Sequence, residues 1–134
     1  MGMAIYCEKT DDMVEMSYGG FASLRARVSD LCGEPWSGHY KKLDDVPQDK
    51  KDAGFWKEFH ETADRMVREG IINAGTVGFL MQDDTHGTLD AAGCRDLLSV
   101  VRADGGTGPL AQRVQGLRFL LEECVRLDCG LYWA

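Results

Sequence analysis

Residues 79–101 read FLMQDDTHGTLDAAGCRDLLSVV, in which an apolar segment runs into an acidic turn (residues 83–90) and a second apolar pattern follows. The second pattern has the i, i+3, i+4, i+7 spacing of one helix face, formed by Cys94, Leu97, Leu98 and Val101. We therefore expect a helix over residues 89–102 that begins at the acidic turn.

The acidic turn brings carboxylates, a histidine and a glycine together. Its structural interpretation is a helix start. Thr85 or Thr88 can cap the helix, and acidic side chains favour its positive end. Gly87 can supply a left-handed conformation.

A ligand-binding interpretation of the same turn stays open. Aligning Gly87 with the sixth position of an EF-hand loop puts Gly93 at the twelfth, where the loop needs a bidentate glutamate. High-affinity calcium binding is therefore disfavoured. A looser transition-metal site would use Asp83, Asp84 and His86, because histidine suits transition metals. Beyond this divalent metal we expect no cofactor.

The rest of the chain predicts a helix-dominated α+β fold in a single domain, residues 1–134. Strands are expected at residues 3–8, 13–18 and 131–133, and further helices at residues 21–32, 52–69, 71–81 and 110–127. The N-terminal hairpin and the short C-terminal strand should pair in a small antiparallel sheet, because a lone three-residue strand is not stable. Asp52 and Asn73 are expected N-caps, and Gly33 a left-handed C-cap.

Residues 36–48 are expected to be the longest irregular stretch, closed by Pro47. Trp36 and Tyr40 are its aromatic residues. They either pin the stretch to the body of the protein or form a recognition surface, since loops often carry binding residues. Both residues are therefore candidates for binding.

The charge balance restricts the partners. The chain holds 22 acidic and 15 basic residues, a net charge of −7. Nucleic-acid binding is disfavoured, and a basic protein partner suits such a surface. No apolar run approaches the roughly 20 residues of a membrane span. The N-terminus lacks the pattern of a signal peptide, so we expect a cytoplasmic protein without membrane contact.

The five cysteines are odd in number and contain no Cys-x-x-Cys pair. This pattern argues against a zinc ribbon, a thioredoxin-like site or a secreted disulfide framework. Cys32, Cys94 and Cys124 fall on apolar helix faces, so we interpret them as small buried hydrophobic residues.

Several short motifs resemble those of an uncharacterised family of small bacterial and phage-associated proteins. They are Tyr18-Gly19-Gly20-Phe21, Leu24-Arg25, Phe79-Leu80, the positions Asp84, Gly87, Leu89 and Cys94, and Gly116-Leu117-Arg118-Phe119. The family's turn commonly reads Asp-Cys-Asp-Gly, whereas this chain has Thr85 and His86 between Asp84 and Gly87. The resemblance implies a shared fold and carries no known activity.

Motifs of nucleophilic or phosphate chemistry are absent: there is no Gly-x-Ser-x-Gly, no phosphate loop and no His-Glu-x-x-His. The first hypothesis is therefore a non-enzymatic interaction or accessory protein of the immunity type. The alternative is a metal-dependent enzyme or metal sensor centred on Asp83, Asp84 and His86.

Overall fold

The computed structural model describes residues 2–134 as an antiparallel sheet covered by helices. The strands are β1 (Gly2–Cys7), β2 (Met13–Ser17), β3 (Gly87–Leu89) and β4 (Leu131–Trp133). The helices are α1 (Tyr18–Cys32), α2 (Trp36–Asp45), α3 (Ala53–Arg68), α4 (Ala74–Met81), α5 (Ala91–Val101) and α6 (Pro109–Leu127), with a 3-10 turn η1 (Gln48–Lys50) before α3. The helix-dominated α+β class is thus confirmed.

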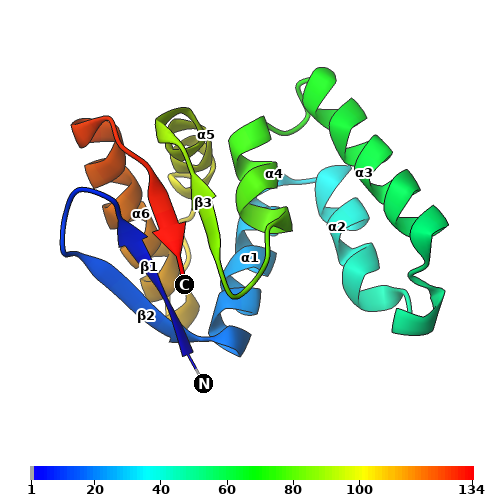
Figure 1. The fold of residues 1–134 in the computed structure, drawn as a ribbon, viewed down its shortest axis with the longest axis horizontal. Helices are drawn as coiled ribbons and strands as arrows, with labels where there is room; N and C mark the ends of the chain where they lie inside the picture. The colour runs from blue at the N-terminus through cyan, green and yellow to red at the C-terminus, as the bar shows by residue number, and fades with distance from the viewer. Residues whose placement is uncertain (1) are drawn as a thin grey trace.

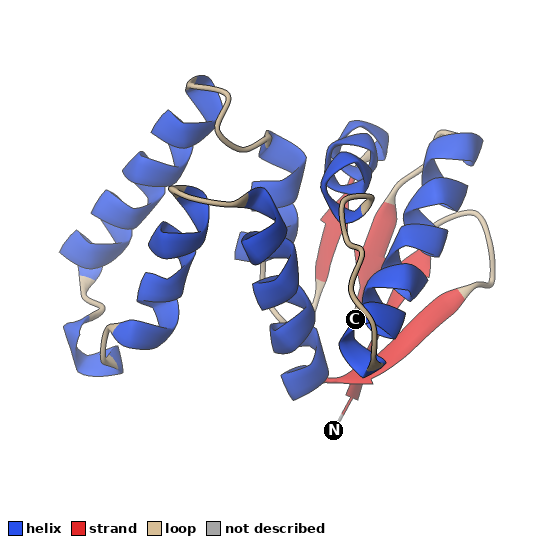
Figure 2. Ribbon diagram, turned by 180° about the vertical axis from the view of Figure 1, so that it is seen from behind, coloured by secondary structure: helices blue, strands red, loops and turns tan. Residues whose placement is uncertain are grey.

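The sheet has the strand order β2-β1-β4-β3, with every neighbouring pair antiparallel. The N-terminal hairpin and the C-terminal strand pair as expected. The additional edge strand, β3, comes from the acidic turn. One face of the sheet is visible without a helix in front of it in Figure 1, and the view from behind in Figure 2 shows α5 and α6 over the other face.

The core lies between the sheet and α1, α4, α5 and α6. At its centre the fully buried rings of Phe21, Phe79 and Trp133 pack together. The Phe21 and Phe79 centroids lie 5.7 Å apart, and those of Phe79 and Trp133 lie 5.5 Å apart, both with the rings nearly perpendicular. Edge-to-face packing of this kind adds to the apolar burial.

Side-chain caps define most helix starts. Asp52 and Asn73 accept hydrogen bonds from backbone N–H groups in the first turns of α3 and α4, as expected. Gly33 ends α1 with a positive φ of 72°, but its ψ of −179° lies outside the expected left-handed helical region. The first helix was expected at residue 21, but it begins at Tyr18. The reason is the Ser17 hydroxyl, which accepts from Gly20 N–H and starts the helix directly after β2.

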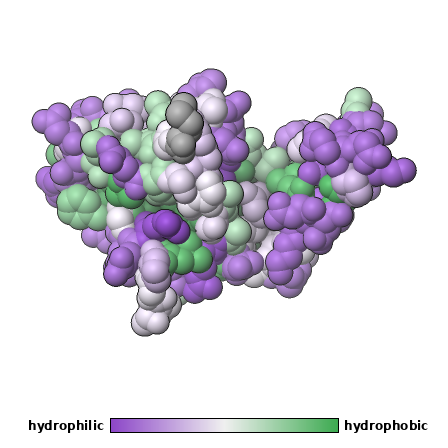
Figure 3. Space-filling model, turned by 90° about the horizontal axis from the view of Figure 1, so that it is seen from below, coloured by the Kyte–Doolittle hydropathy of each residue, from purple (hydrophilic) through white to green (hydrophobic). Residues whose placement is uncertain are grey.

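The expectation of an irregular stretch at residues 36–48 is wrong, because most of it forms α2. Trp36 and His39 are both buried, and their i, i+3 spacing places them on one helix face. Together α2, η1 and α3 form a helical hairpin that projects sideways from the sheet (Figure 1), and its surface is mainly hydrophilic in Figure 3.

The helix expected at residues 89–102 begins later, as α5 at Ala91. Its cap is Asp90, whose carboxylate accepts from Gly93 N–H at 2.7 Å. Thr88 lies in β3 instead, because the edge of β4 offers this segment a strand partner. The expected caps, Thr85 and Thr88, are therefore wrong.

Candidate functional site

The acidic turn connects α4 to β3 and is held by its own hydrogen bonds. Asp83 accepts from the Thr85 hydroxyl at 2.6 Å and from Thr85 N–H at 2.7 Å. These bonds lower the pKa of the Asp83 carboxyl. His86 is exposed, and its Nδ1 lies 3.4 Å from the same hydroxyl oxygen. Thr85 therefore closes the turn rather than starting the next helix.

Asp84 forms an ion pair with Arg25 of α1. Its Oδ1 lies 2.6 Å from Arg25 Nη1, while Arg25 Nη2 donates to the Gln82 carbonyl at 2.8 Å. The Arg25 side chain is only 6% exposed, and its guanidinium carbon lies 4.2 Å from the Phe21 ring centroid. Burial lowers the pKa of this guanidinium, against the opposite effect of Tyr40 and Asp84. Because the Asp84 side chain is 67% exposed, water also solvates this ion pair, and its main effect is to tie the turn to α1.

Trp133 fixes the other side of the turn. Its indole N–H donates to the Asp83 carbonyl at 2.9 Å, and its ring lies directly over Gly87. The expectation of a left-handed Gly87 is wrong, because its φ is not positive. A β-carbon at this position would overlap the indole ring. Glycine is needed here for the close approach of Trp133.

The three candidate metal ligands of the turn do not form one ligand set. Within residues 2–134, the only His, Cys, Asp or Glu group whose ligand atoms all lie within 4.8 Å of one another consists of cysteines. The Asp83 carboxylate accepts hydrogen bonds from Thr85, and the Asp84 carboxylate forms an ion pair with Arg25. The turn is built as a joint between α1, α4 and the sheet.

The candidate binding residues of α2 are directed into the protein. Trp36 is fully buried, and Tyr40 is half-buried beside it with ring centroids 6.1 Å apart. Burial raises the pKa of the Tyr40 hydroxyl. His39 stacks on Phe59 of α3 at 4.0 Å, and its Nε2 lies 3.1 Å from the Phe59 carbonyl oxygen. Trp36 and Tyr40 thus join the helical hairpin to the core, whereas His39 and Phe59 join its two helices to each other.

We call the face of the sheet opposite α5 and α6 the open face. It carries a continuous row of side chains. Cross-strand register places Met13, Tyr6, Tyr132 and Thr88 side by side over all the strands. The Tyr6 and Tyr132 rings stack with centroids 4.8 Å apart. Met13 is 48% exposed and Tyr132 is 40% exposed. Exposed aromatic and methionine side chains of this kind are enriched in protein interfaces.

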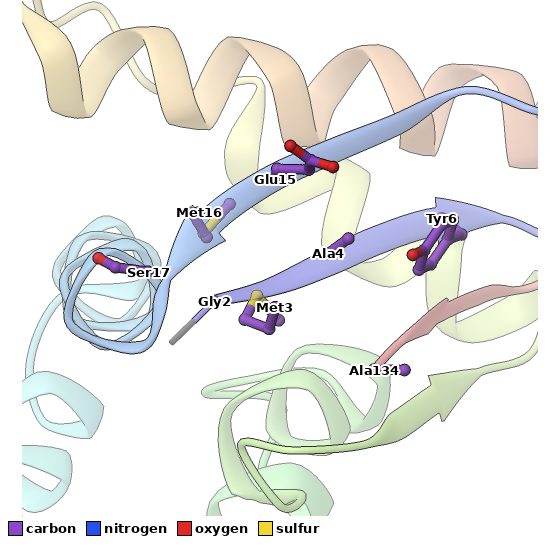
Figure 4. Close-up of a pocket in the computed structure, with 8 residues that line it drawn as sticks. All are labelled: Gly2, Met3, Ala4, Tyr6, Glu15, Met16, Ser17 and Ala134. Atoms are coloured by element: carbon purple, nitrogen blue, oxygen red, sulfur yellow. The ribbon is translucent and has the colours of Figure 1, made fainter.

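A depression next to this row deepens the open face. It has a volume of about 550 Å³, and Figure 4 shows Glu15 and Tyr6 on strands β2 and β1 among the residues that line it. Ala4 and Ala134 are small and leave this space between the larger side chains. Glu15 is the only charged residue in the strands. The depression therefore combines aromatic and apolar walls with one carboxylate.

Sequence reasoning missed a cluster of thiols on the helix-covered side of the sheet. The Sγ atoms of Cys7, Cys124 and Cys129 all lie within 4.8 Å of one another, and those of Cys7 and Cys129 are 3.6 Å apart. The group could not be predicted from local spacing, because Cys7 and Cys129 are 122 residues apart in the sequence.

No protein-family model, no curated protein and no solved structure matches this chain. Every helix in residues 2–134 is too short or too polar to span a lipid bilayer.

Proposed function

We propose that this chain is a non-enzymatic accessory or immunity-type protein of the cytoplasm that binds a basic partner protein through the open face. The observation that supports the proposal is the row formed by the exposed Met13, the half-buried Tyr6 and the exposed Tyr132, which crosses neighbouring strands without a covering helix. Exposed apolar groups that are contiguous, rather than scattered, are typical of interaction sites.

The chemistry of the open face favours a cationic side chain on the partner. The stacked rings of Tyr6 and Tyr132 offer π-faces and edges to an arginine or lysine. The Glu15 carboxylate lies beside the depression, where it can pair with the same cation. The net charge of −7 attracts a basic protein over a longer range and disfavours a nucleic-acid ligand.

Site-specific photo-crosslinking in the native host tests this proposal. A photoreactive amino acid replaces Tyr132, and a matched variant carries it at Phe119 of α6, which is 53% exposed on the opposite side of the molecule. We expect Tyr132 to crosslink one discrete basic protein and Phe119 not to do so. The addition of Glu15→Lys should remove that crosslink, because it places a cation against the partner's cation.

Two outcomes contradict the proposal. One is the same crosslinking pattern at both positions, which would mean non-specific contact. The other is a crosslink at Tyr132 that Glu15→Lys leaves unchanged, which would mean that charge complementarity at the depression plays no part.

A further inference from the structure

The thiol cluster lies where the two ends of the chain are joined. Cys7 is the last residue of β1, Cys124 lies on α6, and Cys129 lies two residues before the start of β4. Cys7 and Cys124 are almost fully buried, and Cys129 is 7% exposed. The group is therefore enclosed by the sheet and α6, on the side away from the open face, and its chemistry is independent of the proposed function.

We propose that Cys7, Cys124 and Cys129 form a structural thiolate site for Zn²⁺, whose fourth ligand would be the thiol of Cys94, which is buried on α5 outside this group of three. Thiolates select soft and borderline metals, and zinc with four sulfur ligands is tetrahedral. Zn–S bonds of about 2.3 Å in a tetrahedron place the sulfurs about 3.8 Å apart. The 3.6 Å between the sulfurs of Cys7 and Cys129 is close to this separation, and the 4.8 Å limit for all three requires only small side-chain movements.

Metal binding would replace two existing hydrogen bonds at the cluster, of which one is the thiol–thiol contact between Cys7 and Cys129. The Cys124 thiol donates to the Gly130 carbonyl at 3.3 Å and would lose this bond on deprotonation. The same carbonyl also accepts from Glu8 N–H at 3.0 Å, so it keeps a partner. On binding, each thiol that coordinates releases its proton to solvent, and its sulfur forms a bond to Zn²⁺.

The competing interpretation is that these cysteines are small buried hydrophobic residues that happen to meet. It predicts that alanine can replace them without any change in metal content. The zinc proposal predicts that loss of two ligands removes the metal. Replacement of Cys32 should leave the metal content unchanged, because Cys32 lies apart from the cluster on α1, where its thiol donates to the Val28 carbonyl. Cys32→Ala is thus the matched control.

The experiment compares the wild type, Cys32→Ala and the double variant Cys7→Ala, Cys129→Ala, all purified under reducing conditions without chelator. Elemental analysis should find about one zinc ion per chain in the first two proteins and less than about a tenth of that in the double variant. Refolding of metal-free wild type with Co²⁺ should give intense thiolate-to-cobalt charge-transfer bands and the visible bands of tetrahedral cobalt. Chelation should lower the Tm of the wild type by at least about 5 °C.

Cys129→Ser, at the least buried of the three positions, replaces the double variant if that protein does not fold, and should bind cobalt at least about tenfold more weakly than wild type. Folded wild type without zinc and without cobalt bands would overturn the proposal. Equal metal content in all variants, or a mass loss of about 2 Da from a Cys7–Cys129 disulfide formed in the presence of zinc, would also overturn it.

Discussion

Replacement of Gly87 by alanine tests the way in which the acidic turn is joined to the core. The turn depends on Trp133, whose ring lies over Gly87 and whose Nε1 would be 2.8 Å from an added β-carbon. Other atoms of the indole ring would overlap this carbon outright. Both the backbone of β3 and the buried indole would have to move.

The expected cost follows from two effects. Overpacking of a well-packed site costs about 1–3 kcal/mol. Displacement of the indole lengthens the hydrogen bond from Trp133 to the Asp83 carbonyl, which contributes about 1 kcal/mol. Gly87→Ala should therefore lower the free energy of unfolding by about 2–4 kcal/mol. At about 3–4 °C per kcal/mol for a chain of this size, the Tm should fall by about 6–16 °C.

Urea unfolding followed by circular dichroism measures this difference. Gly105→Ala is the matched control, since a β-carbon there has no atom within 4 Å and the residue has no positive φ. The control should be neutral within about 0.5 kcal/mol. Adding Trp133→Phe to Gly87→Ala should cost less than the sum of the two single changes, because the smaller ring makes room for the methyl group. A Gly87→Ala variant as stable as the control would refute the close-approach argument.

Three further predictions concern the same turn and one buried carboxylate. Asp90→Ala should lower the free energy of unfolding in urea by about 1 kcal/mol, because Asp90 caps α5. Thr88→Ala should lower it by less than about 0.5 kcal/mol, and the reverse order would mean that Thr88 is the cap. Arg25→Ala should lower the free energy of unfolding by about 3 kcal/mol, because the buried side chain packs against the core. Asp84→Asn should lower it by less than about 1 kcal/mol, because the Asp84 side chain is 67% exposed. Equal losses for the two variants would contradict this prediction. The pKa of Asp104 is lowered by its arginine partner, so the stability it contributes is present above its unfolded pKa of about 4 and is lost as pH falls through the lower folded value. The stability difference between wild type and Asp104→Asn should therefore be constant above about pH 5 and shrink below about pH 3, and a difference that persists at low pH would contradict this.

The fold was largely predictable from the sequence because local patterns determine most of its elements. Helical periodicity and the cap at Asp52 gave the bounds of α3 to within one residue, whereas α4 begins at Ala74, directly after its cap Asn73 and three residues later than expected. The strand β3 was missed, since three residues beside a glycine have no period of their own and become a strand only against β4. The helix α2 was missed because Pro35 and Gly38 obscured the buried spacing of its aromatic residues.

The candidate site was less predictable, because its parts meet through tertiary structure. The partner of Asp84 is a buried arginine 59 residues earlier in the chain, so the turn carried no local sign of its structural role. The open face depends on the register that places Tyr6 beside Tyr132. One local signal was present for the thiol cluster, the five-residue spacing of Cys124 and Cys129, but its third member lies at the other end of the chain.

The central claim is that the open face is the contact surface of the protein. Its most direct test is the affinity for the protein that crosslinks at Tyr132, measured by titration calorimetry. The double variant Tyr6→Ala, Tyr132→Ala should bind at least about 30-fold more weakly than wild type, the loss expected when an aromatic hot spot of about 2 kcal/mol is removed. Phe119→Ala, on α6, should change the affinity less than about threefold. Equal affinities of wild type and the tyrosine variant, both folded, would contradict the claim.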